Sequence, residues 1–223
     1  MKKLFLYFSV LFFTLVSNKG YTTNHDFGLF ADFGYEFGLV NNDNTFVNDG
    51  HNGAASSDTL EHSSFNTIGG SIGVSYMDYF FRIGYESSND LDLSGTVTFT
   101  TERTINKANL DVDNWSISFG KFFKINDSFR LYPQAGIGLA NIEYPNLTST
   151  DGVLLARASD SSDLSWSFGL GTDYEIVKNI SSFLEYKYTN YGRVDLLGST
   201  DNFKSDGLLI KNHGLRIGLR YNF

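Results

Sequence analysis

The last eleven residues of the chain, HGLRIGLRYNF, alternate between two kinds of side chain. An apolar residue takes every second position, and glycine, arginine or asparagine takes the positions between. Successive side chains of a β-strand point to opposite faces, so this segment has one wholly apolar face and one face rich in arginine and glycine. The pattern predicts a strand that keeps an apolar face away from water up to its last residue, Phe223.

The same alternation recurs in seven earlier segments, whose other face consists mainly of glycine, serine and charged residues. Several of these segments are close to the length of about 9 to 11 residues that a tilted strand needs to cross the hydrocarbon of a bilayer. No apolar run after the N-terminus approaches the length of about 18 residues that marks a membrane helix. The predicted strands lie at about 27–39, 68–76, 79–85, 115–123, 129–139, 164–174, 184–188 and 215–223.

The joins between these segments alternate between short and long. Short joins lie at 77–78, 124–128 and 176–179, whereas long joins rich in Asn, Asp, Ser, Thr and Gly lie at about 41–64, 88–110, 145–163 and 190–208. The third strand is predicted to continue to Leu91 or Leu93, because Tyr85 lies too close to Tyr79 to reach a second membrane interface. The layout predicts an all-β fold, an eight-stranded antiparallel up-and-down transmembrane β-barrel with four long loops at one end.

Aromatic residues gather towards both ends of the predicted strands, as they do where a barrel crosses the two interfaces of a bilayer. The turn-end girdle is predicted to contain Phe27, Tyr76, Tyr79, Phe123, Phe129, Tyr174, Tyr221 and Phe223. The loop-end girdle is predicted to contain Phe37, Phe65, Trp115, Tyr144, Trp166 and Tyr188. The apolar faces should therefore contact lipid; the alternative is a soluble β-sandwich or ligand-binding barrel in the periplasm, with these faces inward.

Charged residues occupy the opposite, inward face. Every backbone group in hydrocarbon needs a partner, so the sheet must close, and the first strand should pair with the last. An eight-stranded barrel is just wide enough for side chains to fill it, so the charges should form a salt-bridged network, with a gated conduit as the alternative. The predicted network contains Asp32, Glu36, Arg82, Glu86, Arg130, Asp173, Glu175, Glu185, Lys187, Arg216 and Arg220.

The N-terminus predicts export. Lys2 and Lys3 precede an uncharged run, LFLYFSVLFFTLV, which is too short for a membrane helix. A secretory signal peptide is therefore expected at 1–20, with cleavage near Ser17 to Gly20, followed by a barrel domain at 21–223. The net charge of −8 and the lack of a basic stripe argue against nucleic acid as a partner. The chain has no cysteine, which excludes disulfides.

The segments LYPQAGIGLANIEY and FLEYKYTNYG, the eight amphipathic strands and the final Tyr-Asn-Phe together resemble small bacterial outer-membrane barrels of the OmpA-like and opacity-protein type. The resemblance implies an outer-membrane location with periplasmic termini and extracellular loops. It also implies that the barrel-assembly machinery recognises a C-terminal signal formed by Leu215, Ile217, Leu219, Tyr221 and Phe223. The separate peptidoglycan-binding domain of full-length OmpA proteins is not expected here.

Candidate chemistry is sparse. The histidines are His25, His51, His62 and His213, and only His51 and His62 share a predicted loop with an acid and several serines. Lipid A palmitoyltransferases are also eight-stranded and use His, Asp and Ser from loops, but nucleophilic catalysis needs a base within about 3 Å of the hydroxyl, which sequence cannot show. Scattered histidines without cysteine make zinc a poor candidate. No catalytic, cofactor-binding or metal site is predicted, and the chain is not expected to be an enzyme.

The favoured function is a structural and surface-interaction role, as a surface antigen, an adhesin or a contact for lipopolysaccharide through the loops. The first alternative is a small porin for ions or small solutes, and the second is a lipid A-modifying acyltransferase. The expected partners are outer-membrane lipid and lipopolysaccharide, the barrel-assembly machinery and a host or surface ligand. The barrel itself is expected to be a monomer.

Overall fold

The computed structural model describes residues 27–41, 63–98, 102–148, 152, 154–194, 197–198 and 208–223. Eight long strands in these ranges form one closed antiparallel sheet. No helix in the same ranges is long and apolar enough to cross a membrane. The long strands are β1 (Phe27–Asn41), β2 (Ser63–Tyr76), β3 (Tyr79–Thr98), β4 (Glu102–Lys121), β6 (Phe129–Tyr144), β9 (Ser159–Val177), β10 (Ile180–Val194) and β12 (Leu208–Asn222).

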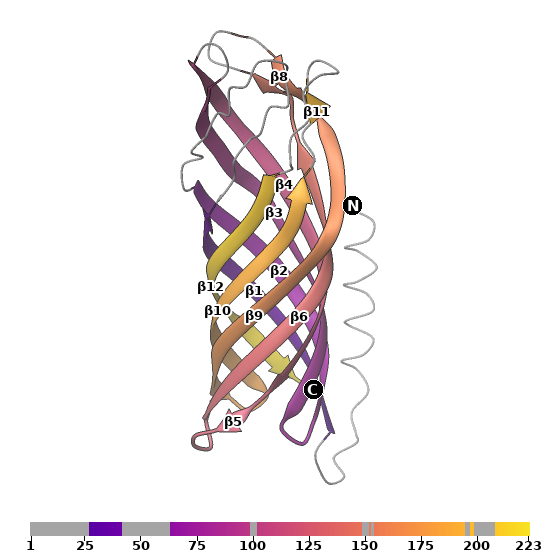
Figure 1. The fold of residues 1–223 in the computed structure, drawn as a ribbon. Helices are drawn as coiled ribbons and strands as arrows, with labels where there is room; N and C mark the ends of the chain where they lie inside the picture. The colour runs from indigo at the N-terminus through magenta and orange to yellow at the C-terminus, as the bar shows by residue number, and fades with distance from the viewer. Residues whose placement is uncertain are drawn as a thin grey trace.

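Pairing between the first and last strands closes the barrel, as predicted. β1 runs antiparallel to β12, with Asp32 opposite Arg220 and Glu36 opposite Arg216. Figure 1 shows the strands tilted together around the barrel, with β8 and β11 near one end and β5 near the other. The prediction of an all-β, eight-stranded antiparallel barrel is confirmed.

Four short strands complete the described structure. β5 (Phe123–Lys124) follows β4 and pairs with β6 near the end that carries the short turns, here called the turn end. β7 (Leu147–Thr148), β8 (Leu154–Arg157) and β11 (Leu197–Gly198) form a separate three-stranded sheet at the opposite, loop end. This small sheet links residues from two of the predicted long loops.

The turns have the predicted positions. Tyr76 pairs with Tyr79 across the Met77–Asp78 turn, and Met77 has a φ of 54°. Asn179 has a φ of 72° in the turn between β9 and β10, as asparagine tolerates better than most residues. Between β5 and β6, the side-chain oxygen of Asn126 accepts hydrogen bonds from the backbone N–H groups of Ser128 and Phe129 at 3.0 and 2.9 Å.

The strands are longer at the loop end than the sequence predicted. The region 88–110 was predicted to be a loop, but most of it belongs to β3 and β4, which pair as far as Thr98 and Glu102. Likewise, β9 begins at Ser159 and β10 ends at Val194, inside regions predicted to be loops. Backbone pairing between neighbouring strands can continue outside a bilayer, so loop-like composition did not mark the strand ends.

The apolar faces point outward, as predicted. Leu219 and Phe168 are 56% and 58% exposed, whereas Arg216 is 3% exposed. Large exposed apolar side chains occur on all eight long strands. This is the reverse of a soluble barrel, whose apolar side chains would fill the interior.

Near the loop end the two faces exchange character. In the middle of β4, Trp115 and Ile117 are exposed and Ser118 is buried, but further out Val112 is buried and Asp111 is exposed. The same exchange occurs in β6, where outward Leu139 is followed by buried Ile142 and Tyr144 and by exposed Asn141 and Glu143. An outward apolar face suits lipid and an outward polar face suits water. The exchange therefore marks the loop-end edge of the lipid-facing belt.

Candidate functional site in the barrel interior

Arg220 is the centre of the turn-end half of the interior. Its side chain is fully buried and donates hydrogen bonds to both carboxylate oxygens of Asp32, at 2.6 and 3.1 Å. It also donates to Asp173 at 2.8 Å. Paired donors that match a carboxylate give a bidentate arrangement, which is the strong form of an arginine ion pair. Arg220 thus joins β1, β9 and β12 across the lumen.

Four aromatic rings surround the same guanidinium. The carbon atom at its centre lies 4.7 to 5.8 Å from the ring centroids of Phe30, Phe122, Tyr132 and Phe183. A cation over an aromatic face is attracted by the ring quadrupole, and more so where water is excluded. The rings therefore help to balance the cost of burying this charge.

Arg82 forms the next level of the network. It pairs with Asp32 at 3.1 Å and with Glu185 at 3.2 Å, and it also donates to the side-chain oxygen of Gln134. Tyr132 donates its hydroxyl to Glu185 at 3.1 Å. Asp32 therefore connects two arginines, and the level that contains Arg82 is continuous with the level that contains Arg220.

Lys187 holds the loop-end half together. Its ammonium group lies 2.8 Å from Glu36 and 2.5 Å from Glu86. Glu36 also accepts a hydrogen bond of 2.6 Å from the side-chain amide of Asn212. Arg216 is held less firmly, with one 3.4 Å hydrogen bond to the carbonyl of Gly69 and a 4.0 Å ion pair to Glu86.

The structure brings together ten of the eleven residues predicted for the network. Arg130, at the turn end, pairs with Asp173 at 2.6 Å and keeps 32% of its side chain exposed. Glu175 is instead exposed, because it lies beyond this last ion pair, where the β9–β10 register shifts next to the turn. With Glu175 outside, five cations face five carboxylates.

An aromatic layer closes the turn end of the lumen, and the sequence analysis missed it. Its core consists of Phe30, Phe80, Phe122 and Tyr132, and their rings pack at centroid distances from 4.7 to 6.1 Å. Each of these residues is buried although it lies on the otherwise polar inward face.

Glycines on neighbouring strands make room for these rings. A Cβ atom on Gly73 would lie 2.3 Å from the ring of Phe30, and Gly73 pairs directly with Phe30 in the sheet. Phe80, Tyr132 and Phe183 lie against their own cross-strand partners, Gly120, Gly171 and Gly218, in the same way. An aromatic residue directly opposite a glycine is the sequence signal that could have revealed this layer, but it requires the register to be known.

A second apolar layer lies on the inward face at the loop end. It lies beyond Lys187, where the strands have exchanged the character of their faces. Phe65 and Tyr191 are in ring contact at a centroid distance of 5.6 Å. The fully or almost fully buried members are Val40, Phe65, Leu110, Val112, Ala140, Ile142, Tyr144, Tyr191 and Ile210. Phe65 and Tyr144 were predicted to face outward in the loop-end girdle, and that prediction is wrong, because both lie where the apolar residues have moved to the inward face. The described interior is thus a charged middle between two apolar layers.

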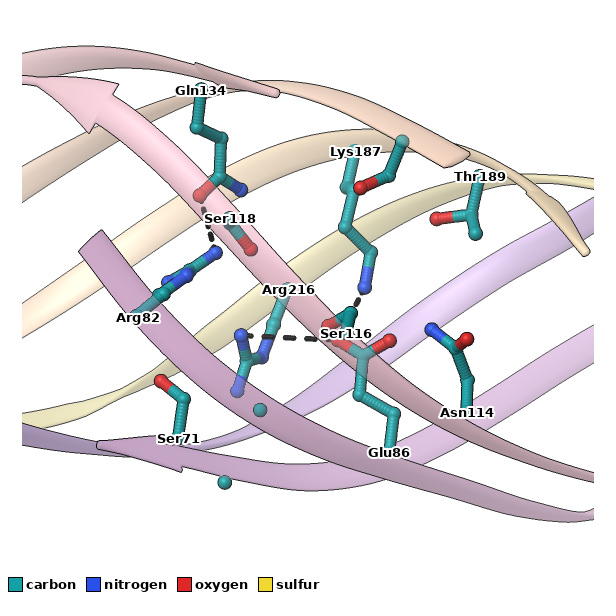
Figure 2. Close-up of a pocket in the computed structure, with 13 residues that line it drawn as sticks. Ser71, Arg82, Glu86, Asn114, Ser116, Ser118, Gln134, Lys187, Thr189 and Arg216 are labelled. Atoms are coloured by element: carbon teal, nitrogen blue, oxygen red, sulfur yellow. Dashed lines mark hydrogen bonds and ion pairs between the residues drawn. The ribbon is translucent and has the colours of Figure 1, made fainter. Parts of the chain in front are cut away.

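Space between the network and the opposite wall is small. A cavity of about 10 Å³ lies beside Arg82, Glu86, Lys187 and Arg216. Figure 2 shows these side chains converging from different strands, with small polar residues such as Ser116 facing them. A volume of this size is about that of a single water probe. The cavity beside the charged network therefore has room for about one water molecule.

The other predicted functional residues lie outside the lumen or outside the described residues. Leu215, Ile217, Leu219 and Tyr221 face outward on β12, and the N–H of Phe223 donates to the carbonyl of Leu29 at 2.9 Å. Their role as an assembly signal stays a prediction.

Of the four histidines, only His213 lies among the described residues. His213 is exposed on the outward face, where its Nδ1 lies 2.8 Å from the hydroxyl of Tyr186. His25, His51 and His62, together with the predicted signal peptide, lie outside the described residues. In the part of the chain that is described, no three His, Asp or Glu side chains are placed to hold a metal ion.

A closed barrel with an apolar exterior and a salt-bridged interior defines the class of small outer-membrane β-barrels. The chain belongs to the outer membrane protein beta-barrel domain family, whose family model matches residues 77–223. It is therefore an outer-membrane β-barrel protein.

Two relatives of similar sequence are also named as outer-membrane proteins. Outer membrane protein X of Enterobacter cloacae is 25% identical over 112 residues, which are 50% of this chain and 62% of the relative. The 31 kDa outer-membrane immunogenic protein of Brucella melitensis biotype 1 is 25% identical over 101 residues, which are 45% of this chain and 41% of the relative. The match therefore spans less than two thirds of the length of either relative.

Solved structures of small barrels share the fold. Neisserial surface protein A matches with a TM-score of 0.57 and 13% identity, over 88% of this chain and 97% of that structure. The outer membrane protein OprG from Pseudomonas aeruginosa matches with a TM-score of 0.53 and 14% identity, over 90% and 98%. At such identity the likeness concerns the fold alone.

Proposed function

We propose that the barrel anchors the chain in the outer membrane and presents its loop end as an interaction surface. The observation that carries this proposal is the packed interior, in which a charged network lies between two apolar layers. A filled lumen offers no route for solutes, whereas the strands that continue past the lipid-facing belt offer a polar exterior. The function is then a surface antigen, an adhesin or a contact for lipopolysaccharide.

The proposed orientation puts the termini and short turns in the periplasm and the loop end outside the cell. Long extracellular loops and short periplasmic turns are the general rule for outer-membrane barrels. The exposed rings of Trp115 and Trp166, together with His213, would lie at the interface where lipopolysaccharide headgroups begin. The barrel-assembly machinery is the proposed partner of the C-terminal residues, and the barrel is proposed to be a monomer.

The name of the Brucella relative supports exposure to a host, because that protein is called immunogenic. We propose that the loop end of this barrel is likewise exposed to a host. A direct test inserts a short epitope tag into the region 42–62 and stains intact cells with a tag antibody. Staining of intact cells is expected; staining that requires permeabilised cells would contradict the orientation.

A single-channel recording separates this proposal from the small-porin alternative. The barrel, purified in detergent and inserted into a planar bilayer, is expected to give no steady conductance. The double substitution Phe65→Ala and Tyr191→Ala, which thins the loop-end layer, tests whether that layer limits ion flow. A steady conductance from the unsubstituted barrel would favour the porin instead.

The acyltransferase alternative has a separate test. The described acids of the lumen face cations at 2.5 to 3.2 Å, an arrangement that salt bridging explains without a substrate. We therefore propose that the barrel is not an enzyme. Mass spectrometry of lipid A from cells with and without the protein should give identical acyl patterns; an added or missing acyl chain would contradict the proposal.

A further inference from the structure

A pair of glycines in the loop-end half of the lumen marks a place where side chains from neighbouring strands converge. Gly38 of β1 lies directly opposite Gly214 of β12, and both are on the inward face. A Cβ atom on Gly38 would collide with the side-chain amide of Asn212. A Cβ atom on Gly214 would collide with the carboxyl group of Glu36. Glycine inside a strand often marks such a close approach, and here it leaves room for an amide and a carboxyl group to meet.

The carboxyl group of Glu36 joins this amide to a lysine. Its Oε1 accepts a 2.6 Å hydrogen bond from Nδ2 of Asn212, and its Oε2 lies 2.8 Å from Nζ of Lys187. Glu36, Lys187 and Asn212 are 1%, 4% and 0% exposed. Figure 2 shows Lys187 extending into the lumen, where its other partner is Glu86 at 2.5 Å. A buried amine and a buried carboxamide thus share one carboxylate.

Lys187 and Asn212 are also close enough in the sheet to reach each other. Lys187 lies opposite Gly214, so Asn212, two positions from Gly214, is its diagonal neighbour on the same face. Diagonal neighbours of an antiparallel pair lie about 7 to 8 Å apart and are within reach of long side chains. Contact between Nζ of Lys187 and Cγ of Asn212 therefore requires rotation of side chains and no movement of the strands.

The surroundings favour a reaction between these two groups. An amine acts as a nucleophile only after it loses its proton, and a base within hydrogen-bond reach must take that proton. Glu36 is within that reach of both groups. Burial disfavours charged groups, so it lowers the cost of converting an ammonium and a carboxylate into a neutral amine and acid. The amide oxygen of Asn212 has no hydrogen-bond partner among the described residues, so a protonated Glu36 can donate to it.

We propose that Lys187 and Asn212 form an intramolecular isopeptide bond, with Glu36 as the catalytic proton carrier. The ammonium group of Lys187 gives one proton to Glu36, and the neutral amine attacks Cγ of Asn212. The Nζ–Cγ bond forms and the Cγ–Nδ2 bond breaks. Glu36 passes its proton to Nδ2, which leaves as ammonia, and takes a second proton from Nζ. Glu36 therefore ends as a neutral acid, and the reaction needs no other reactant.

The product keeps the charges of the lumen balanced. Before the reaction five cations face five carboxylates, and after it four of each remain, because Lys187 and Glu36 are both neutral. Glu86 keeps its 4.0 Å ion pair with Arg216. The bond fastens β10 to β12, the strand that closes the barrel against β1, and encloses residues 188–211 in a covalent loop. It is a modification of the chain itself and does not depend on what the loops recognise.

Peptide mapping of the barrel purified from outer membranes tests the bond. After denaturation and digestion with trypsin, the segments that contain Lys187 and Asn212 are expected as one branched peptide. Its mass should be about 17 Da below that of the two segments together, because ammonia is lost. Separate segments of full mass, with complete cleavage after Lys187 even when the folded barrel has been incubated for days, would overturn the proposal. This map needs no variant, so it decides the question even where a variant does not fold.

Lys187→Arg is the matched variant. Arginine keeps a positive charge beside Glu36 and Glu86 but cannot form the bond, so the map should show two separate segments of full mass. Loss of the same mass in this variant would mean that Asn212 cyclises on its own backbone, and the proposal would be wrong.

Two further variants separate catalysis from the mere presence of an amide. Glu36→Gln should slow formation of the branched peptide by about 100-fold or more, as loss of a general acid–base group does. An unchanged rate would contradict its role as the proton carrier. Asn114→Ala removes another buried inward amide, whose oxygen accepts a hydrogen bond from Ser165, and should leave the branched peptide in place. Loss of the branched peptide in Asn114→Ala would show that the wrong carboxamide had been assigned.

Discussion

Replacement of Arg220 by methionine tests whether one buried guanidinium holds the turn-end half of the lumen together. Arg220→Met keeps a long side chain that can pack among the surrounding aromatic rings, so it removes the charge and the hydrogen bonds with little change in volume. The two bonds to Asp32 and the one to Asp173 are lost. Asp32 keeps Arg82 and Asp173 keeps Arg130, so neither carboxylate is left wholly unpaired.

The expected loss in the free energy of unfolding follows from the ion pairs that Asp32 and Asp173 keep. Breaking a buried ion pair by removing one partner costs about 3 to 5 kcal/mol, and the remaining cations place the expected loss near 3 kcal/mol. That loss is roughly a hundredfold in the folding equilibrium constant, since 1.36 kcal/mol corresponds to a factor of ten. Arg216→Met is the matched control on the same strand, because Arg216 is also buried but has one 3.4 Å hydrogen bond and a 4.0 Å ion pair. Its expected cost is about 1 kcal/mol.

The assay is urea unfolding of the barrel from lipid vesicles. Fluorescence of Trp115 and Trp166, both exposed on the lipid-facing belt, reports folding, and the mobility of unheated samples on a gel gives the folded fraction independently. Equal losses for the two variants, within about 0.5 kcal/mol, would refute the reasoning, because burial alone would then explain the effect of either arginine.

Three further outcomes are expected. Ile217→Arg, at the middle of the lipid-facing belt, should cost about 2 to 4 kcal/mol in the same unfolding assay, and Tyr221→Arg, near the interface, about 0 to 1 kcal/mol. Gly73→Ala should lower the free energy of unfolding by about 1 to 3 kcal/mol, because its Cβ would lie 2.3 Å from a buried ring; Gly84→Ala, whose nearest neighbour is at 3.3 Å, should cost less. Deletion of Phe223 should reduce folded protein in cell membranes without changing refolding in detergent, as a gel-mobility comparison would show; equal reductions in both would contradict an assembly signal.

Inward apolar residues near the loop end show where the local pattern was insufficient. In β4 the run Leu110, Asp111, Val112, Asp113 alternates as regularly as the run after it, but with the apolar residues on the inward phase. The predicted loop ended at about Leu110 and the predicted strand began at Trp115, so the run was not assigned to a strand. A change of phase within an unbroken alternation was the signal that these residues belong to a strand continuing past the lipid.

Glu175 shows the same limitation for the ion-pair network. It shares its alternation phase with Asp173, so the pattern placed both in the lumen. Only the register of β9 with β10 and the position of Arg130 separate a buried, paired carboxylate from an exposed one. For the other ten charged residues the phase of the alternation alone gave the correct face.

The sequence by itself determined the number of long strands, the face of most side chains in the lipid-facing belt and the class of membrane barrel. A strand repeats every two residues, so this information is local and can be obtained from any short segment. Only the tertiary structure decided which charges pair, where rings meet glycines and how the lumen is closed. Those contacts join residues as distant as Asp32 and Arg220, which are 188 positions apart, and they exist only once closure and register bring the strands together.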